Sequence, residues 1–189
     1  MSLCDVARMS MLSRKWRNLC LDIPSLELEW YELSDAPNDG THSSICQQRP
    51  YTEKYVKRVD QVLHNYRDHK KFKSFSLVCC LEFSFANEVN RWINFVAASK
   101  GTLQSLTLYF ICRQEGFRGL VYPAYTKLHV ISGSFLSQFS CLQDLHLDSC
   151  VLNLENNDLV LSRYLTTLDL YNVNVQGEVT QWQGILSSK

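Results

Sequence analysis

Two histidines and two aspartates are the residues of this sequence with the clearest capacity for chemistry. His129 and His146 stand near Asp148 and Asp169 in a region of short apolar segments. Imidazole and carboxylate groups can act together as a general base or as metal ligands. However, neither the nucleophile motif G-x-S-x-G nor a metal-ligand motif such as H-E-x-x-H accompanies them. The sequence therefore predicts a protein that is not an enzyme and needs no metal or other cofactor.

His146 and Asp148 lie within a stretch that has the spacing of a leucine-rich repeat. Residues 142–152 read L-x-x-L-x-L-x-x-C-x-L, with Leu145 and Leu147 on either side of His146. Because side chains alternate across a strand, these leucines would point into a core while His146 points away from it. One such unit cannot cover its own apolar face, so it requires similar units stacked on both sides.

Further copies of this pattern occur along the chain. Residues 165–175 repeat it almost position for position, whereas other segments contain only its first half, with aromatic residues in place of some leucines. These partial copies are Ile23–Leu28, Phe72–Leu77, Leu103–Leu108 and, more loosely, Tyr125–Val130. Stacked strands with helices inserted between them predict an irregular leucine-rich-repeat solenoid of the α/β class, with about five or six repeats.

The outward strand positions of these repeats predict a binding surface. In stacked repeats they would form two columns, Ser76, Thr107, His129, His146 and Asp169 beside Val78, Tyr109, Ile131, Asp148 and Tyr171. Solenoids usually bind their partners on such a face, and exposed aromatic side chains concentrate binding energy. The residues expected to contact a client protein are Thr107, Tyr109, His129, His146, Asp148, Asp169 and Tyr171. The alternative is that these are ordinary exposed strand residues.

Charge is unevenly spread along a chain whose formal net charge is zero. Residues 22–39 contain six acidic residues and no Lys or Arg, whereas residues 49–73 contain eight Lys or Arg and three acidic residues. An acidic segment followed by a basic one is typical of complementary surfaces. No nucleic-acid-binding motif accompanies the basic segment, and no apolar stretch is long enough to span a membrane. We therefore expect neither a nucleic acid nor a membrane as a partner.

The placement of the cysteines indicates a reducing compartment. Of the eight cysteines, Cys80 and Cys150 occupy the inward repeat position, where a small buried side chain is required. Cys79 would point to the opposite face of an extended segment. The chain contains no C-x-x-C pair, no N-x-S/T sequon and no signal-peptide apolar run near its N-terminus. The cytoplasm or the nucleus is the expected location.

Two helices are predicted between the early repeats. Residues 32–51 are rich in turn formers and predict a loop, after which Thr52 is a suitable N-cap for a helix reaching about Asp68. Asn87 could cap a second helix in which Trp92 anchors the core. The tail 176–189 contains Trp182, Ile185 and Leu186 but no complete repeat, so the predicted array has no C-terminal cap.

The first residues carry a resemblance to a known family. Leu3–Leu19, which read L-C-D-V-A-R-M-S-M-L-S-R-K-W-R-N-L, are followed by I-P-S-L and resemble the second half of a plant F-box. The segment N-R-W-I-N-F at 90–95, before an L-x-x-L-x-L strand, is also similar to plant F-box/leucine-rich-repeat proteins of the FBD-associated type. In that family the F-box binds a Skp-type adaptor linked to a cullin, and the repeats capture the protein to be ubiquitinated.

The resemblance implies a domain organisation and a function. Residues 1–31 would form a partial F-box and first strand, 32–51 a loop, and 52–189 the repeat region with its inserted helices. The adaptor would contact the apolar positions Val6, Met9, Leu12, Trp16 and Leu19. The implied function is substrate recognition in an SCF-type E3 ubiquitin ligase. The family's L-P-x-x-I-L segment and first helix would precede the matched residues, and the chain begins after them. The competing expectation is therefore a stand-alone repeat protein that does not dock to the ligase.

Overall fold

The parallel strands of this protein form two sheets. The computed structural model describes residues 24–36, 49–66, 72–80, 85–98, 102–110, 128–154 and 164–177. One sheet has five strands in the order β1-β2-β3-β5-β7, and the other has three in the order β4-β6-β8. The strands are β1 (Ser25–Glu29), β2 (Ser74–Cys79), β3 (Ser105–Phe110), β4 (Val130–Ser132), β5 (Asp144–Asp148), β6 (Val151–Asn153), β7 (Thr167–Tyr171) and β8 (Asn174–Gln176). The predicted α/β class is confirmed at this level.

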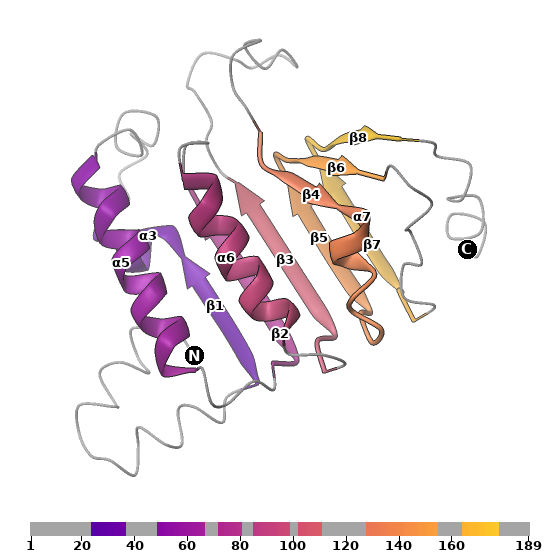
Figure 1. The fold of residues 1–189 in the computed structure, drawn as a ribbon, viewed down its shortest axis with the longest axis horizontal. Helices are drawn as coiled ribbons and strands as arrows, with labels where there is room; N and C mark the ends of the chain where they lie inside the picture. The colour runs from indigo at the N-terminus through magenta and orange to yellow at the C-terminus, as the bar shows by residue number, and fades with distance from the viewer. Residues whose placement is uncertain are drawn as a thin grey trace.

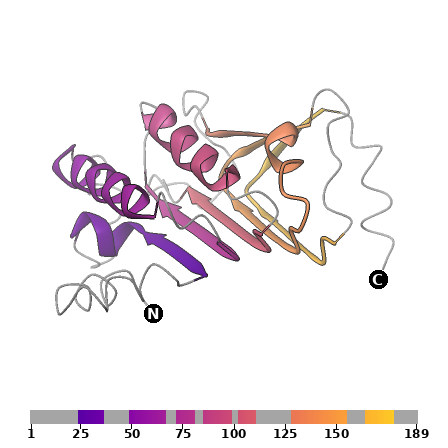
Figure 2. The ribbon, with the colours of Figure 1, turned by 60° about the horizontal axis from the view of Figure 1, so that its bottom comes forward.

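Helices cover one face of the five-stranded sheet. They are α5 (Arg49–Asn65), α6 (Ala86–Ala97) and the short α7 (Gly133–Leu136), whereas α3 (Trp30–Ser34) directly follows β1 and packs against α5. In Figures 1 and 2, α5 and α6 lie on the same side of this sheet as the second sheet. The chain therefore has a strand layer and an opposite layer that changes from helices to short strands along its length.

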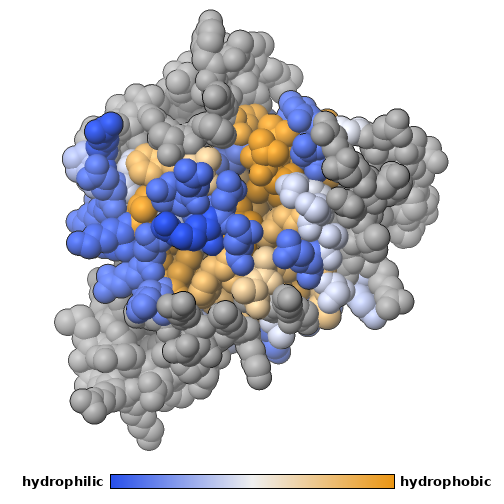
Figure 3. Space-filling model, in the orientation of Figure 1, coloured by the Kyte–Doolittle hydropathy of each residue, from blue (hydrophilic) through white to orange (hydrophobic). Residues whose placement is uncertain are grey.

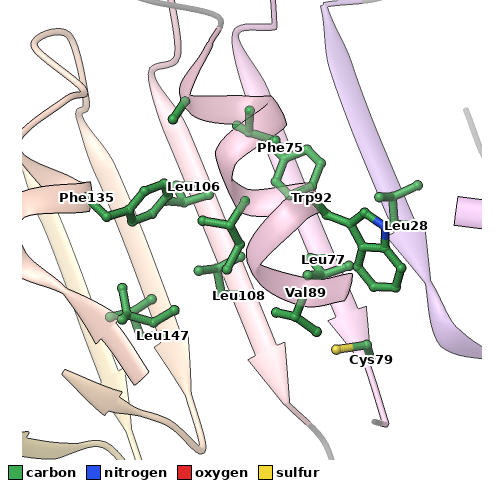
Figure 4. Packing of buried hydrophobic residues seen from close by; sticks show 14 of the residues in the cluster. Leu28, Phe75, Leu77, Cys79, Val89, Trp92, Leu106, Leu108, Phe135 and Leu147 are labelled. Carbon is green, nitrogen blue, oxygen red and sulfur yellow. The ribbon is translucent and has the colours of Figure 1, made fainter. Parts of the chain in front are cut away.

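The repeat pattern places apolar residues of the same phase on neighbouring strands. Leu106 pairs with Leu145, and Leu145 pairs with Leu168. The same row continues backwards through Phe75 to Leu26. These side chains point into the core, where Figure 4 shows Val89 and Trp92 of α6 directed toward the strands. The expectation that the L-x-L segments of these copies lie side by side is confirmed.

The strands also begin in the same way. The carbonyl oxygen of Lys73 accepts hydrogen bonds from the N–H groups of both Gln104 and Ser105, at 2.8 and 3.0 Å. Equivalent pairs of bonds end on the carbonyls of Pro24, Gln104 and Gln143. The chain leaves β5 and β7 through residues with left-handed backbone, Ser149 at φ 56° and Asn172 at φ 51°. The repeated spacing of the sequence thus corresponds to repeated backbone geometry.

The prediction that Tyr125–Val130 is a loose copy of the strand pattern is wrong. Residues 130–132 form β4, which belongs to the second sheet, and Val130 pairs there with Val151. In the first sheet β3 is followed directly by β5. An L-x-V spacing is weak information in so short a segment, and Val130 is exposed rather than buried. β4 is thus the counterpart of β6 and β8, with which it forms the second sheet.

The helices begin and end differently from the prediction. Residues 30–34, expected to lie in or beside a loop, form α3, and α5 begins at Arg49 rather than after Thr52. α6 begins at Ala86, and its N-cap residue Phe85 makes no side-chain capping hydrogen bond. Asn87 is therefore inside the helix, where packing of the apolar face outweighs a favourable cap. Trp92 is buried, as predicted.

The structure corrects one expectation about the cysteines, and other expectations concern residues outside the described ranges. Cys79 does not point to the opposite face: it alternates in phase with Leu77 and is buried in the core, and Cys80 and Cys150 are buried as expected. The predicted adaptor-contacting residues Val6, Met9, Leu12, Trp16 and Leu19 lie outside the described residues. So do residues 37–48 of the predicted loop and 178–189 of the tail.

Candidate interaction face

The side of the five-stranded sheet that faces away from the core carries six of the seven predicted client-binding residues, all except His129. We call it the outward face and define it by three rows of paired positions. They are Ser25, Ser74, Ser105, Asp144 and Thr167; Glu27, Ser76, Thr107, His146 and Asp169; and Glu29, Val78, Tyr109, Asp148 and Tyr171. Alternation along each strand separates these side chains from the buried leucines and aromatics.

The register of the predicted columns is confirmed except at one strand. Thr107 pairs with His146, which pairs with Asp169, and Tyr109, Asp148 and Tyr171 pair in the same order. His129 and Ile131 do not belong to these columns. Ile131 lies in β4 of the second sheet, and His129 directly precedes that strand. His129 is buried and stacks on the ring of Phe110, with 4.5 Å between ring centroids. It therefore has no place on the outward face.

The outward face is acidic. Its charged residues are Glu27, Glu29, Asp144, Asp148 and Asp169, and none of its positions holds Lys or Arg. Burial, together with the nearby charges of Glu32 and Glu27, raises the pKa of the Glu29 carboxyl above its usual value. Like charges thus crowd one another at this end of the face.

Three basic side chains of the helices have acidic partners on the other layer. The carboxylate of Asp35 forms ion pairs with Lys54 and Arg58 of α5. Arg91 of α6 is paired with Asp60. Figure 3, which views the helix side, shows hydrophilic side chains gathered over these helices. The two layers therefore differ in charge, and the cations of α5 and α6 do not neutralise the outward face.

The aromatic residues of the third row are exposed, whereas Asp148 between them is partly buried. In the third row, Val78 is 8% exposed, Tyr109 37% and Tyr171 59%. The carboxylate of Asp148 stands between these two tyrosines and accepts a hydrogen bond of 2.7 Å from the hydroxyl of Ser149. Over β3, β5 and β7 the face thus offers two exposed aromatic rings to a partner.

One row brings together residues that resemble an acid–base pair. His146 Nδ1 lies 2.8 Å from Asp169 Oδ2, and Thr107 is beside His146 on the next strand. Within the described residues, no hydrogen bond joins the Thr107 hydroxyl to His146. The pair therefore lacks the hydrogen bond by which a histidine activates a hydroxyl as a nucleophile.

The described residues contain no group of three or more His, Cys, Asp or Glu arranged to hold a metal ion. Nor, among these residues, is any helix sufficiently long and apolar to cross a bilayer.

The sequence-based columns omitted some residues of the face. Glu27 and Glu29 belong to it because β1 pairs with β2, and Asp144 belongs to its first row. The outward position of Glu27 could have been predicted, since Leu26 and Leu28 flank it in the partial repeat copy Ile23–Leu28. Asp144 could have been found by extending the same alternation by two residues before His146.

Comparison with known proteins identifies no relative of this chain. No family model matches it, and searches of curated proteins and solved structures give no significant match.

Proposed function

We propose that this chain is the substrate-recognition subunit of an SCF-type E3 ubiquitin ligase and binds a client protein on its outward face. The observation that carries the binding role is the register that puts the outward positions of β3, β5 and β7 side by side. The likeness of residues 3–19 to the second half of a plant F-box supports the link to the ligase. The chain would make or break no bond itself. It would hold the client close to an associated ubiquitin-conjugating enzyme.

We also propose that the strands belong to an irregular leucine-rich-repeat solenoid. Three observations support this finer fold: the parallel order of the five strands, the shared hydrogen-bonding pattern at their starts, and the left-handed residue after β5 and β7. In a solenoid each repeat packs mainly on its neighbours, and outward positions line one continuous surface. That surface is where the client would bind.

The two proposed contacts use different parts of the chain. A Skp-type adaptor, and through it a cullin, would be bound by Val6, Met9, Leu12, Trp16 and Leu19. The client would be bound by Thr107, Tyr109, His146, Asp148, Asp169 and Tyr171. The cytoplasm or nucleus is the proposed location, in keeping with the free thiols of Cys141 and Cys150.

A stand-alone repeat protein is the second candidate. The observation in its favour is the register of β3, β5 and β7, which supports a partner-binding face and by itself requires no ligase. In this case the outward face would still bind a protein partner, but no ligase would be attached.

Capture by a purified Skp-type adaptor separates the two candidates. We expect the intact chain to be retained on immobilised adaptor, and Leu12→Ala or Trp16→Ala to reduce retention at least about tenfold if both side chains are buried in the interface. Tyr171→Ala, on the outward face, is the matched control and should be retained like the wild type. If the intact chain is not retained, the ligase role is lost and the stand-alone role remains.

A further inference from the structure

The row of Tyr109, Asp148 and Tyr171 has the composition of a site for a cationic side chain. Each of the three lies directly beside the next on adjacent strands. Adjacent strands are about 4.8 Å apart, so the two tyrosines start roughly 10 Å from each other with the carboxylate between them. An ammonium or guanidinium group can pair with a carboxylate while resting on an aromatic ring. Both rings are exposed.

The remaining carboxylates extend this site along the strands. Asp144 and Asp148 are on the same side of β5, and Asp169 of β7 stands in the row between them. Rows two residues apart are separated by roughly 6.6 Å, which is also the distance between alternate side chains of any extended peptide. An extended segment running along β5 with cations at alternate positions would therefore meet a carboxylate in each row.

The charge of the face selects among classes of partner. None of the described positions that define the outward face holds Lys or Arg, and Lys54, Arg58 and Arg91 of the helices are paired with Asp35 and Asp60 on the other layer. Nucleic acids and anionic membrane surfaces would be repelled by such a face. A protein segment rich in Lys or Arg would be attracted to it and steered toward it.

We propose that the outward face over β3, β5 and β7 binds an extended segment of the client with Lys or Arg at alternate positions, one of which sits at Asp148 between Tyr109 and Tyr171. This inference rests on the proposed function, because it names the chemistry of the client. His146 is paired with Asp169 in the middle row of the face, which the centre of the bound segment would cover. On the neighbouring strand β3, the hydroxyls of Thr107 and Ser105 offer further hydrogen-bonding groups to the segment.

Binding of short labelled peptides to the full chain tests this proposal by fluorescence anisotropy. The probe alternates arginine and serine. One comparison peptide has the same composition with the arginines in a block, and the other replaces arginine by glutamate. We expect the alternating arginine peptide to bind most tightly, the block peptide more weakly, and the glutamate peptide not measurably. Raising the salt concentration should weaken binding, since ion pairs at a surface are screened.

Variants locate the peptide on the chain. Asp148→Asn should weaken binding of the alternating peptide about tenfold, through loss of a charge-assisted bond. Tyr171→Ala should weaken it about threefold, through loss of the ring contact. The matched controls are Glu53→Gln, an exposed acidic residue on α5, and Tyr164→Ala, an exposed tyrosine outside the three rows. Both controls should bind like the wild type, and circular dichroism checks that every variant is folded.

Several results would overturn the proposal. They are equal binding of the arginine and glutamate peptides, equal binding of the alternating and block peptides, and equal losses in Asp148→Asn and Glu53→Gln. Adaptor capture, measured on the same preparation, keeps the two proposals apart. Capture without peptide binding removes the basic-client inference and leaves the ligase role. Peptide binding without capture leaves the inference and favours the stand-alone protein.

Discussion

The indole N–H of Trp92 donates a hydrogen bond to Asp60 Oδ1 over 2.8 Å, and this bond joins α6 to α5. Arg91 Nη2 contacts both oxygens of the same carboxylate, at 2.6 and 2.7 Å. The two contacts differ in surroundings, because Trp92 is buried whereas the side chain of Arg91 is 59% exposed. Asp60 is therefore a polar link between two helices that otherwise pack through apolar faces.

Replacing Asp60 should reveal this difference. Asp60→Ala leaves a buried N–H without its acceptor, and we expect a loss of about 1–3 kcal/mol in the free energy of unfolding. Arg91→Ala removes an exposed ion pair and should cost less than about 1 kcal/mol. Urea denaturation midpoints measure both. Equal losses in the two variants would show that the link through Trp92 contributes nothing.

Leu147 and Leu170 occupy paired positions on the inner side of the sheet, so replacing each of them by alanine gives two matched variants. These residues pair on neighbouring strands, yet Leu147 is 1% exposed and Leu170 is 36% exposed. Leu147→Ala should cost roughly 2–5 kcal/mol because it leaves a cavity, whereas Leu170→Ala should cost about 1 kcal/mol because water already reaches the side chain. His146→Ala, which points outward, should change stability by about 0.5 kcal/mol or less. A cost for Leu170→Ala as large as that for Leu147→Ala would contradict the exposure difference along the row.

The ion pairs of Asp35 predict a dependence of stability on pH. Hydrogen bonds from Arg58 and Lys54 lower the pKa of the Asp35 carboxyl from 3.8 to about 2. Because the pKa in the folded state is lower than in the unfolded state, this group stabilises the fold above pH 3.8, and the contribution is lost as the pH falls toward 2. The side chain is half exposed, so solvent screening should limit the contribution to about 1 kcal/mol or less.

Asp35→Asn tests this pH dependence without disturbing the backbone. Asp35 has a left-handed backbone with φ 58°, a conformation that asparagine also tolerates. We expect the variant to be less stable than the wild type at pH 6, with a difference that shrinks as the pH falls toward 2 and that is smaller at high salt. A difference in the free energy of unfolding that stays constant from pH 6 to pH 2 would show that the carboxylate charge is not its cause.

The cysteines should differ in their reaction with alkylating agents. Burial raises the pKa of the Cys150 thiol to about 12, so almost no thiolate forms there at pH 8. Cys79 and Cys80 are also buried, whereas Cys141 is partly exposed. In the folded protein, iodoacetamide should therefore modify Cys141 before the other three, as mass spectrometry of peptides would show. Denaturant should remove the difference, and early labelling of Cys150 in the native state would contradict its burial.

The sequence by itself determined the phase of the inner rows. Leu106, Leu145 and Leu168 are flanked by polar residues at alternate positions, and a strand has no other way to bury its apolar side chains together. The outward position of Thr107, His146 and Asp169 follows from the same alternation. The adaptor-binding and client-binding roles remain predictions, supported by a resemblance and by the register of the strands.

Only the tertiary structure decided which sheet each strand joins. Val130 and its neighbours have a spacing that fits the first sheet, yet they pair with β6 in the second and take His129 into the core. Likewise, nothing in the local sequence joins Asp60 to Trp92. Alternation is a local property of a few residues, whereas strand order and helix contacts depend on which distant segments gain most by packing together. That choice is made by the whole chain, and so a local pattern cannot predict it.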